Sequence, residues 1–376
     1  MTFLEQKVES DPGQMAAKLL TIAAGGTGGH LFPAQALAEE MLSRGWRVNL
    51  STDERGAQYA DCFPEAVAVE VVSAGTFARG GLVTKLAVPF RILGGWLSAW
   101  IRMRKDRPAV VVGFGGYPAL PAMLAAILSR TPTLIHEQNG VLGRVNQLLA
   151  KRVDIVACGM WPTELPSSVT GTFIGNPVRS AILERAGSEY IVPGDWPMSV
   201  LAMGGSQGSR ILSQIIPAAM ALLPQDMKDR LNVAQQARAE DHDDTVAAYL
   251  AAGVMAEVKP FFDDVPLRMS KCQLVITRSG ASTVADISTI GRPSILIPLA
   301  IAIRDEQAVN AKCLSSVGAA IVLKESELNA EALSGYIHTV LSDGEVATQM
   351  ATAALTQGKP EAASDLADLV SGLAGE

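Results

Sequence analysis

The chain alternates short aliphatic runs with longer stretches in which apolar residues recur at the spacing of a helix. Aliphatic runs over residues 19–24, 109–112, 200–203 and 274–277 each lead through a turn of glycine and other small residues into an amphipathic stretch. This repeated order of strand, turn and helix predicts parallel sheets with helices on both faces. Ligands of such sheets bind beyond the carboxyl ends of the strands, so we expect the functional site at these turns.

The expected elements fall into two groups. After the first turn we expect a helix over residues 33–44, because proline is favoured in a first helical turn and glycine follows many helix ends. The stretch between residues 179 and 197 contains prolines and aromatic residues without a clear period. We place a hinge there, which predicts two similar domains facing across a cleft, residues 1–178 and 179–354.

Length and composition support a globular, cytosolic protein. A chain of 376 residues suits two domains, and 48% hydrophobic with 18% charged residues excludes a disordered or fibrous protein. The four cysteines lie far apart without a Cys-x-x-Cys motif, so we expect neither a zinc site nor disulfides. The N-terminal stretch has no cationic start, which argues against a signal peptide, and apolar runs such as residues 92–101 are shorter than the ~20 residues of a spanning helix. A net charge of −7 with few aromatic residues argues against nucleic acid as a partner.

Charge is distributed unevenly along the chain. Residues 1–180 hold 17 lysines and arginines against 14 acids, whereas residues 181–376 hold 14 against 24. Within residues 74–107, seven cations accompany a single acid and are interleaved with leucine, phenylalanine and tryptophan. Cations beside exposed apolar side chains, among them Phe77, predict a surface that binds anionic lipids. A plain alternative stays open for the helix expected near residues 92–103, whose apolar face would then pack in the core.

The glycine turns are suited to bind phosphate groups. Glycines between a strand and a helix let backbone N–H groups approach an anion, and the helix N-terminus adds positive potential. The turns lack the Gly-Lys-Ser/Thr of a Walker loop, and Leu31 stands where a dinucleotide fingerprint needs its third glycine. Asp53, after an expected strand over residues 47–52, is the one residue that favours a dinucleotide-dependent dehydrogenase.

Six motifs occur in the chain in the order of one known family. They are GGTGGH at residues 25–30, GFGGY at 113–117, HEQN at 136–139, GNPVR at 175–179, GGSQG at 204–208 and RSGA at 278–281. Together they resemble the MurG family of N-acetylglucosaminyltransferases, which completes lipid II in peptidoglycan synthesis. The resemblance covers about residues 20–312 and implies a GT-B fold, an α/β architecture of two Rossmann-like parallel-sheet domains. It also implies that a last helix, about residues 355–376, packs back onto the first domain.

The resemblance implies an inverting transfer of N-acetylglucosamine without a cofactor or metal. The donor would be UDP-N-acetylglucosamine. The acceptor would be the C4 hydroxyl of undecaprenyl-pyrophosphoryl-N-acetylmuramyl-pentapeptide, a polyprenyl-linked lipid that the transfer converts from lipid I to lipid II. We therefore expect a peripheral protein on an anionic membrane surface, at the cytoplasmic face of the cell membrane, with wall-synthesis proteins as possible partners.

The family's donor contacts carry over to residues in both expected domains. They fall on Thr27, Gly28, Gly29, Asn139, Arg179, Ser206, Phe262, Ala281, Ser282, Thr283, Val284, Ala285, Asp286 and Gln307. Ser206 and the amides after it would hold the diphosphate, the backbone of Phe262 the uracil, and Asp286 both ribose hydroxyls. The chain departs from the family pattern at Asp286, where glutamate is common, so the ribose contact would be longer or water-mediated. It departs again at residues 299–303, which are more apolar than the turn expected before Gln307.

Inverting transfer needs a base for the acceptor hydroxyl. His30 is the preferred base, because it lies just ahead of an expected helix N-terminus, where the dipole keeps the imidazole neutral. His136 is the competing candidate; in the alternative interpretation it only orients Gln138 and Asn139.

The departing diphosphate would be stabilised by helix N-termini at Ser206 and Ala281, with Arg179 or Arg278 nearby. The acidic run at residues 241–244 is interpreted as a solvated helix start and not as a metal site. Two rival functions stay open. A UDP-N-acetylglucosamine 2-epimerase would share the donor, but would need more acids near the sugar and no membrane-binding segment. A protein that only senses nucleotide sugars at a membrane surface would keep the donor motifs.

Overall fold

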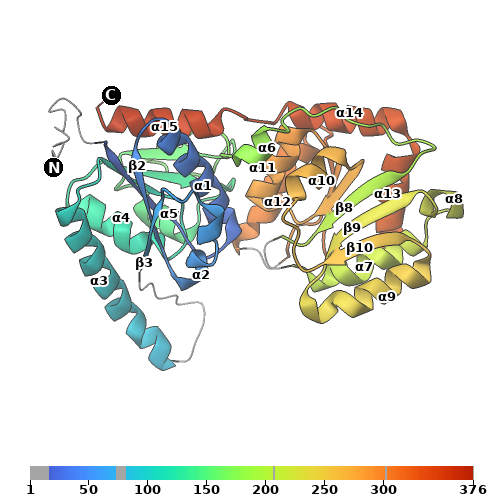
Figure 1. Cartoon of the computed structure of the whole chain (residues 1–376), viewed down its shortest axis with the longest axis horizontal. Coiled ribbons are helices and arrows are strands. Elements are labelled where there is room, and N and C mark those ends of the chain that lie inside the picture. The colour runs from blue at the N-terminus through green and yellow to red at the C-terminus, as the bar shows by residue number, and fades with distance from the viewer. Residues whose placement is uncertain (1–16, 73–81, 206–207, 301–302, 376) are drawn as a thin grey trace, which may run out of the picture.

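The computed structural model describes residues 17–72, 82–205, 208–300 and 303–375, which form two parallel β-sheets (Figure 1). The first sheet has seven strands in the order β3-β2-β1-β4-β5-β6-β7, and the second has six in the order β10-β9-β8-β11-β12-β13. Neighbouring strands pair in parallel throughout both sheets. The strands are β1 (Leu19–Ala23), β2 (Arg47–Thr52), β3 (Ala68–Val71), β4 (Val110–Gly113), β5 (Thr133–Glu137), β6 (Ile155–Cys158), β7 (Gly171–Phe173), β8 (Met198–Met203), β9 (Leu231–Gln236), β10 (Met255–Lys259), β11 (Leu274–Thr277), β12 (Ser294–Leu296) and β13 (Ala320–Val322).

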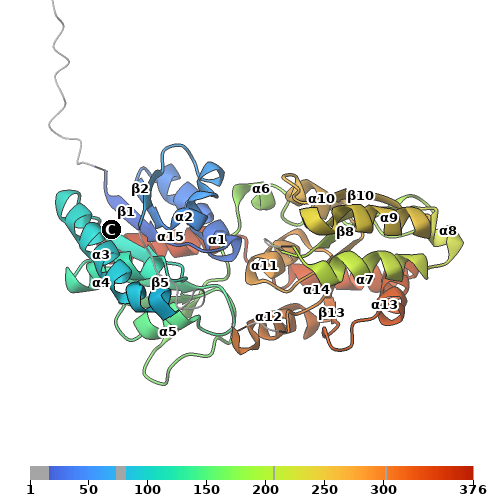
Figure 2. The same cartoon turned by 90° about the horizontal axis from the view of Figure 1, so that it is seen from below.

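Helices cover both faces of each sheet, as the alternating sequence pattern predicts (Figures 1 and 2). They are α1 (Gly28–Ser43), α2 (Glu54–Ala57), α3 (Leu82–Lys105), α4 (Ala119–Leu128), α5 (Arg144–Leu149), α6 (Ser180–Leu183), α7 (Arg210–Ala221), α8 (Gln225–Lys228), α9 (His242–Ala252), α10 (Val265–Lys271), α11 (Ala281–Ile290), α12 (Glu306–Ser315), α13 (Ala330–Ser342), α14 (Gly344–Leu355) and α15 (Ala362–Leu373). Within the described part of the chain, no helix is both long enough and apolar enough to cross a membrane.

Each sheet is buried on both faces, which explains why its central strands are apolar without alternation. In β4, Val110 and Val112 pack with residues of α1 and α15, whereas Val111 packs with residues of α3 and α4. β11 behaves in the same way. Ile276 packs with α7 and α13, and Val275 packs with α11 and α12. The loops after the carboxyl ends of these strands lie where the two domains face each other.

The last helix returns to the first domain. α14 packs in the core of the second domain through Ala347, whereas α15 places Leu366 and Val370 in the core of the first, beside α1. Arg44, the residue directly after α1, donates to Asp368 of α15 at 2.6 Å. In Figure 1, α14 lies along the second domain and α15 along the first, so the chain connects the two domains a second time.

The first helix begins earlier than the sequence predicts. α1 begins at Gly28 instead of residue 33, with the extended Thr27 at its N-cap position, so Pro33 lies inside the helix. The turn between β1 and α1 is that short because Gly26 adopts a φ of 92°, which glycine adopts without strain. The free N–H groups of the first helical turn therefore belong to the glycine motif itself.

Helix α3 combines the two alternatives that its sequence left open. Ala99 and Met103 are buried in the first domain, and Trp96 and Trp100 pack against the same cluster. On another face, Leu93, Leu97 and Ile101 are 58, 45 and 55% exposed. We call these three residues the α3 stripe. The helix lies on the side of the first domain that faces away from the second (Figures 1 and 2). Phe77, which was expected to extend this surface, is outside the described residues.

Candidate functional site

A cleft of about 620 Å³ lies between the two domains, at the carboxyl ends of both sets of strands. Figure 2 shows α1 of the first domain and α11 of the second side by side at this boundary. The cleft is lined by the candidate base His30 and by seven of the residues predicted to bind the donor: Thr27, Gly29, Asn139, Ala281, Ser282, Thr283 and Gln307. Two glycine-turn regions that are far apart in sequence therefore meet around one cavity, as predicted.

Other predicted donor residues do not line this cleft. Gly28 is buried beneath it, where a Cβ atom would come within 3.0 Å of the Phe32 ring. Val284 and Ala285 line a separate pocket of about 270 Å³. Ser206 lies outside the described residues. Because α11 turns once every 3.6 residues, only its first turn, Ala281 to Thr283, reaches the cleft.

Four helices of the described part of the chain, α1, α7, α11 and α12, begin at the cleft. The turn before α7 is tight, because a Cβ atom on Gly204 would lie 2.3 Å from the Ser209 nitrogen. Gly205 and Gly208 adopt φ angles of 81° and 66°, which favour glycine. The first N–H groups of a helix have no partner within the helix, and the aligned peptide dipoles add positive potential there. The cleft therefore offers backbone donors from both domains to a diphosphate.

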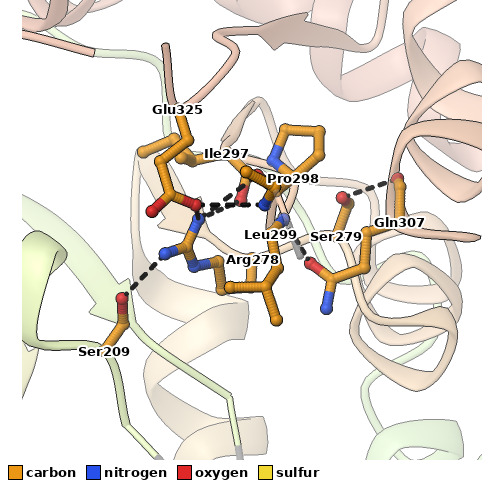
Figure 3. Close-up of polar contacts among 9 residues, drawn as sticks. Ser209, Arg278, Ser279, Ile297, Pro298, Leu299, Gln307 and Glu325 are labelled. Carbon is orange, nitrogen blue, oxygen red and sulfur yellow. Dashed lines mark hydrogen bonds and ion pairs between the residues drawn. The ribbon is translucent and has the colours of Figure 1, made fainter. Parts of the chain in front are cut away.

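Arg278 brings a buried positive charge to the same cleft (Figure 3). It follows β11 and is only 6% exposed. Its Nη1 donates to Glu325 Oε2 at 3.0 Å and to the carbonyls of Ile297 and Pro298, and its Nη2 donates to Ser209 Oγ at 3.1 Å. These partners hold the guanidinium beside the start of α7. Its N–H groups therefore lie beside those of the helix N-terminus, with Glu325 as its counter-ion.

Gln307 is oriented by the backbone of the unexpectedly apolar segment. The N–H of Leu299 donates to Gln307 Oε1 at 3.0 Å, and Ser279 Oγ donates to the Gln307 carbonyl at 2.7 Å (Figure 3). The side-chain type at residue 299 matters little for a contact made by its N–H. With Oε1 engaged, the Nε2 group is the part of Gln307 available to donate to a ligand hydroxyl.

His30 lies at the cleft, and His136 lies behind it. The His30 ring packs against the GFGGY turn, because a Cβ atom on Gly115 would lie 3.3 Å from its Cε1 atom. His136 is 0% exposed, and burial lowers its pKa to about 4, so the ring is neutral near pH 7. His136 therefore cannot reach a substrate in the cleft. Gln138 lies between the two rings, within hydrogen-bond distance of both.

Asp286 and Arg179 lie together beside the cleft and outside its lining. The guanidinium of Arg179 is 4.2 Å from the centre of the Phe32 ring, and its Nη2 is 3.8 Å from Asp286 Oδ2. Burial raises the pKa of Asp286 to about 6, although the charge of Arg179 opposes this shift. The Phe262 ring is buried beneath Arg268, whose guanidinium lies 4.4 Å from it. These contacts do not test the predicted roles of Asp286 at the ribose and of Phe262 at the uracil, which stay predictions.

Polar contacts across the domain boundary close the cleft at its edges. Asn310 of α12 donates from Nδ2 to Asn139 Oδ1 at 2.9 Å and accepts from the Gly140 N–H at 3.2 Å. Pro33 has no N–H for the Gly29 carbonyl, and this carbonyl accepts a hydrogen bond from Ser282 Oγ at 3.4 Å. A proline inside α1 therefore leaves a helix carbonyl free for the second domain.

Two other sequence candidates have local structural roles. Asp53 caps α2 by accepting from the Gly56 N–H at 3.0 Å. Helix α9 begins at His242, as the acidic run predicts, but Asp241 is buried and lies 3.4 Å from Arg210 instead of being solvated. Among the described residues, no three or more His, Cys, Asp or Glu side chains are grouped so that they could hold a metal ion.

Sequence reasoning missed Ser209, Glu325 and Asn310 as members of the site. Ser209 directly follows the GGSQG motif, so its position was a usable signal. Glu325 and Asn310 carry no local signal, because their partners Arg278 and Asn139 are 47 and 171 residues away in the chain.

Comparisons with known proteins agree with this geometry. The chain matches the glycosyltransferase family 28 N-terminal domain over residues 20–158 and the family 28 C-terminal domain over residues 199–366. It is 47% identical to the UDP-N-acetylglucosamine--N-acetylmuramyl-(pentapeptide) pyrophosphoryl-undecaprenol N-acetylglucosamine transferase of Caulobacter vibrioides, over 94% of this chain and 98% of that protein. The chain belongs to glycosyltransferase family 28. The identically named protein of Phenylobacterium zucineum is 45% identical, again over 94% of this chain and 98% of that protein.

Solved structures place this family 28 chain in the GT-B fold. The crystal structure of Acinetobacter baumannii MurG matches with a TM-score of 0.74 and 31% identity, over 94% of this chain and 99% of that one. The resemblance to the MurG family inferred from the six motifs is confirmed. A UDP-N-acetylglucosamine 2-epimerase of Listeria monocytogenes matches with a TM-score of 0.63 at 14% identity, which shows a shared fold alone.

Proposed function

We propose that this chain transfers N-acetylglucosamine from UDP-N-acetylglucosamine to the C4 hydroxyl of undecaprenyl-pyrophosphoryl-N-acetylmuramyl-pentapeptide, converting lipid I to lipid II with inversion. The observation that carries the proposal is that His30 and the N-termini of α1, α7 and α11 line one cleft between two domains. The transferases of that name that are 47 and 45% identical to this chain, over 94% of its length, support the same substrates.

His30 is the proposed general base. Its neutral imidazole takes the proton of the acceptor hydroxyl while the oxygen attacks the anomeric carbon from the face opposite UDP. The bond from that carbon to the diphosphate oxygen breaks, and the proton on His30 later passes to solvent. UDP departs carrying extra negative charge. The N–H groups at the starts of α7 and α11 and the guanidinium of Arg278 line the cleft and would stabilise it.

The remaining donor contacts are part of the same proposal. Residues at the cleft wall would bind the diphosphate and sugar, and Gln307 Nε2 would donate to a sugar hydroxyl. Ser206 would assist at the diphosphate, Phe262 at the uracil, and Arg179 and Asp286 at the ribose. We also assign residues 1–178, with the helix near 355–376, to the acceptor side, and residues 179–354 to the donor side.

The α3 stripe is the proposed membrane contact. Its three exposed apolar residues lie on one face, and the last turn of α3 carries Arg102, Arg104 and Lys105. Apolar side chains beside cations are the features that bind an anionic bilayer surface. The four cysteines are free thiols, which suits the reducing cytosol and hence the cytoplasmic face of the membrane. Other wall-synthesis proteins are further partners in this proposal.

The deciding experiment measures UDP release by the full chain with UDP-N-acetylglucosamine, with and without a short-chain lipid I analogue. Release that requires the acceptor is expected. An epimerase would change the donor without acceptor, and a sensor would bind the donor without turnover; either result would refute the proposal. His30→Ala should lower kcat by ~10²-fold or more at unchanged donor affinity, since general base catalysis contributes on the order of 10²–10⁴. His242→Ala, at the start of α9 and outside the cleft lining, is the matched control.

A further inference from the structure

Gln138 forms a polar bridge between the cleft and the buried core. It follows β5 directly and is 1% exposed, although it contributes to the cleft wall. On the cleft side, its Oε1 lies 3.1 Å from His30 Nδ1. On the core side, its Nε2 lies 3.2 Å from His136 Nδ1 and 3.1 Å from the His136 carbonyl. His136 Nε2 in turn lies 3.1 Å from the Gly175 carbonyl. We call this series of groups the Gln138 relay.

The direction of every hydrogen bond in the Gln138 relay follows from its buried end. A backbone carbonyl only accepts, so His136 Nε2 must carry a proton and donate to Gly175. A neutral His136 then has an unprotonated Nδ1, which accepts from the Gln138 amide nitrogen. The reversed amide would place its oxygen against two acceptors, His136 Nδ1 and the His136 carbonyl. The amide orientation is therefore fixed by the network.

The cleft end of the relay is determined by the same logic. Gln138 Oε1 has no proton, so the contact with His30 requires a proton on His30 Nδ1. In neutral His30 the other nitrogen, Nε2, then carries the lone pair. This is the nitrogen that a base at the cleft wall needs. When His30 takes a proton, Oε1 still accepts from Nδ1, so the protonated ring keeps the same orientation.

We propose that Gln138 is a positioning residue that holds His30 in the Nδ1–H tautomer, with Nε2 free to accept the proton of the acceptor hydroxyl. This inference rests on the proposed function, in which His30 is the base. His136 and the Gly175 carbonyl act through Gln138, by fixing which end of its amide faces the cleft. The GNPVR motif thereby acquires a role in orienting the base, because its first glycine supplies the terminal acceptor.

The amide of Gln138 accepts a hydrogen bond from His30 without adding a charge, whereas a carboxylate at this position would add one. Gln138→Glu would place a negative charge beside His30 and His136 and favour their protonated forms. Gln138→Met has nearly the same shape, but removes the acceptor for Nδ1–H, so it favours the other tautomer. The other charged groups around the cleft are Arg210, Arg238, Arg278, Glu306 and Glu325, with Glu137 buried behind. They are common to all variants, so differences between variants come from position 138.

The test uses the full chain and two kinds of measurement. ¹⁵N NMR of histidine-labelled protein reports the tautomer of His30 directly. The chain has only four histidines, and His30→Ala identifies the signal. The unaltered chain should show a protonated Nδ1 and an unprotonated Nε2, and Gln138→Met should lose this state. Gln147→Met, on the exposed side of α5, should leave it unchanged.

Kinetics with the short-chain acceptor form the second measurement. Gln138→Met should lower kcat by ~10–100-fold, the range known for partners that orient metal-bound histidines, with UDP affinity unchanged. Gln138→Glu should move the acid limb of the kcat/KM profile to higher pH by at least ~1 unit. A proton on Nε2 of His30 in the unaltered chain would overturn the inference, as would an unmoved acid limb in Gln138→Glu. Absence of acceptor-dependent UDP release by the unaltered chain would instead refute the proposed function, and the tautomer would still decide the relay.

Discussion

The carboxyl group of Asp286 is ionised at a cost to the stability of the free enzyme, and its removal should make the protein more stable. The residue lies in α11 and is 8% exposed. Burial raises its pKa from 3.8 to about 6, and the charge of Arg179, 3.8 Å away, offsets only part of that effect. An unfolded chain would hydrate the same carboxylate, so the ionised form is less costly there.

The magnitude follows from the difference between the folded and unfolded pKa. A shift of about 2 units at 1.36 kcal/mol per unit corresponds to ~3 kcal/mol. Below pH 3.8 both states are protonated, and the group has no effect on this scale. Between pH 3.8 and about 6 the folded state binds more protons than the unfolded state, so stability is lost as the pH rises, and the full ~3 kcal/mol is missing at pH 8. Asn cannot ionise, so Asp286→Asn avoids this loss. The variant should therefore gain stability at pH 8 and little at pH 4.

Calorimetric unfolding at pH 4, 6 and 8 without donor measures this effect. At ~2–4 °C per kcal/mol for a domain of this size, the second domain should melt roughly 6–12 °C higher at pH 8 in Asp286→Asn. Asp263→Asn, at an exposed acid before α10, is the matched control. Asp286→Asn should also weaken UDP binding by at least ~10-fold, because charge-assisted hydrogen bonds contribute ~1.5–3 kcal/mol each. A variant that is equally stable at pH 8, or whose gain does not depend on pH, would refute the reasoning.

Two further predictions concern the surface and the domain boundary. Replacing Leu93, Leu97 and Ile101 together by serine should reduce cosedimentation with anionic liposomes while turnover on the short-chain acceptor is kept. Leu250→Ser, at a 76% exposed leucine of the second domain, is the control, and equal loss of binding and turnover would indicate a packing defect instead. Asn310→Ala removes one side chain that bonds both Asn139 and Gly140, so the unliganded protein should open, with a larger radius of gyration in small-angle scattering. An unchanged scattering curve would show that other contacts keep the cleft closed.

Local pattern was sufficient to predict the fold and the general position of the site. Buried strands such as β4 and β11 are short aliphatic runs that end in glycine or small residues, so their order along the chain indicated two parallel sheets. The residues that lie at a strand end or a helix start, including His30 and Ala281, were found because those positions converge in any parallel sheet. For other predicted residues, the position along the helix determines whether the side chain lines the cleft. Asp286 lies on the same helix as Ala281, and its side chain faces Arg179 instead of the cleft lining.

Contacts between distant residues were beyond sequence reasoning. The link from His30 to Gln138 spans 108 residues, and the link from Arg278 to Glu325 spans 47. The HEQN motif was recognised in the sequence, but the order of its residues does not show that its glutamine contacts two histidines at once. That arrangement depends on where the turn after β5 meets the start of α1, which only the assembled sheet determines.

The incorrect start predicted for α1 shows how a broken local rule can mark a site. The rule that proline lies near a helix start moved the predicted start forward to residue 33, whereas the helix begins at Gly28. Pro33 inside the helix removes the hydrogen bond that the Gly29 carbonyl would otherwise accept. The cost is partly recovered because Ser282 of the facing domain donates to that carbonyl. In a helix without Pro33, the Gly29 carbonyl would accept a hydrogen bond within the helix. The two glycine turns would then have lost a direct contact across the cleft.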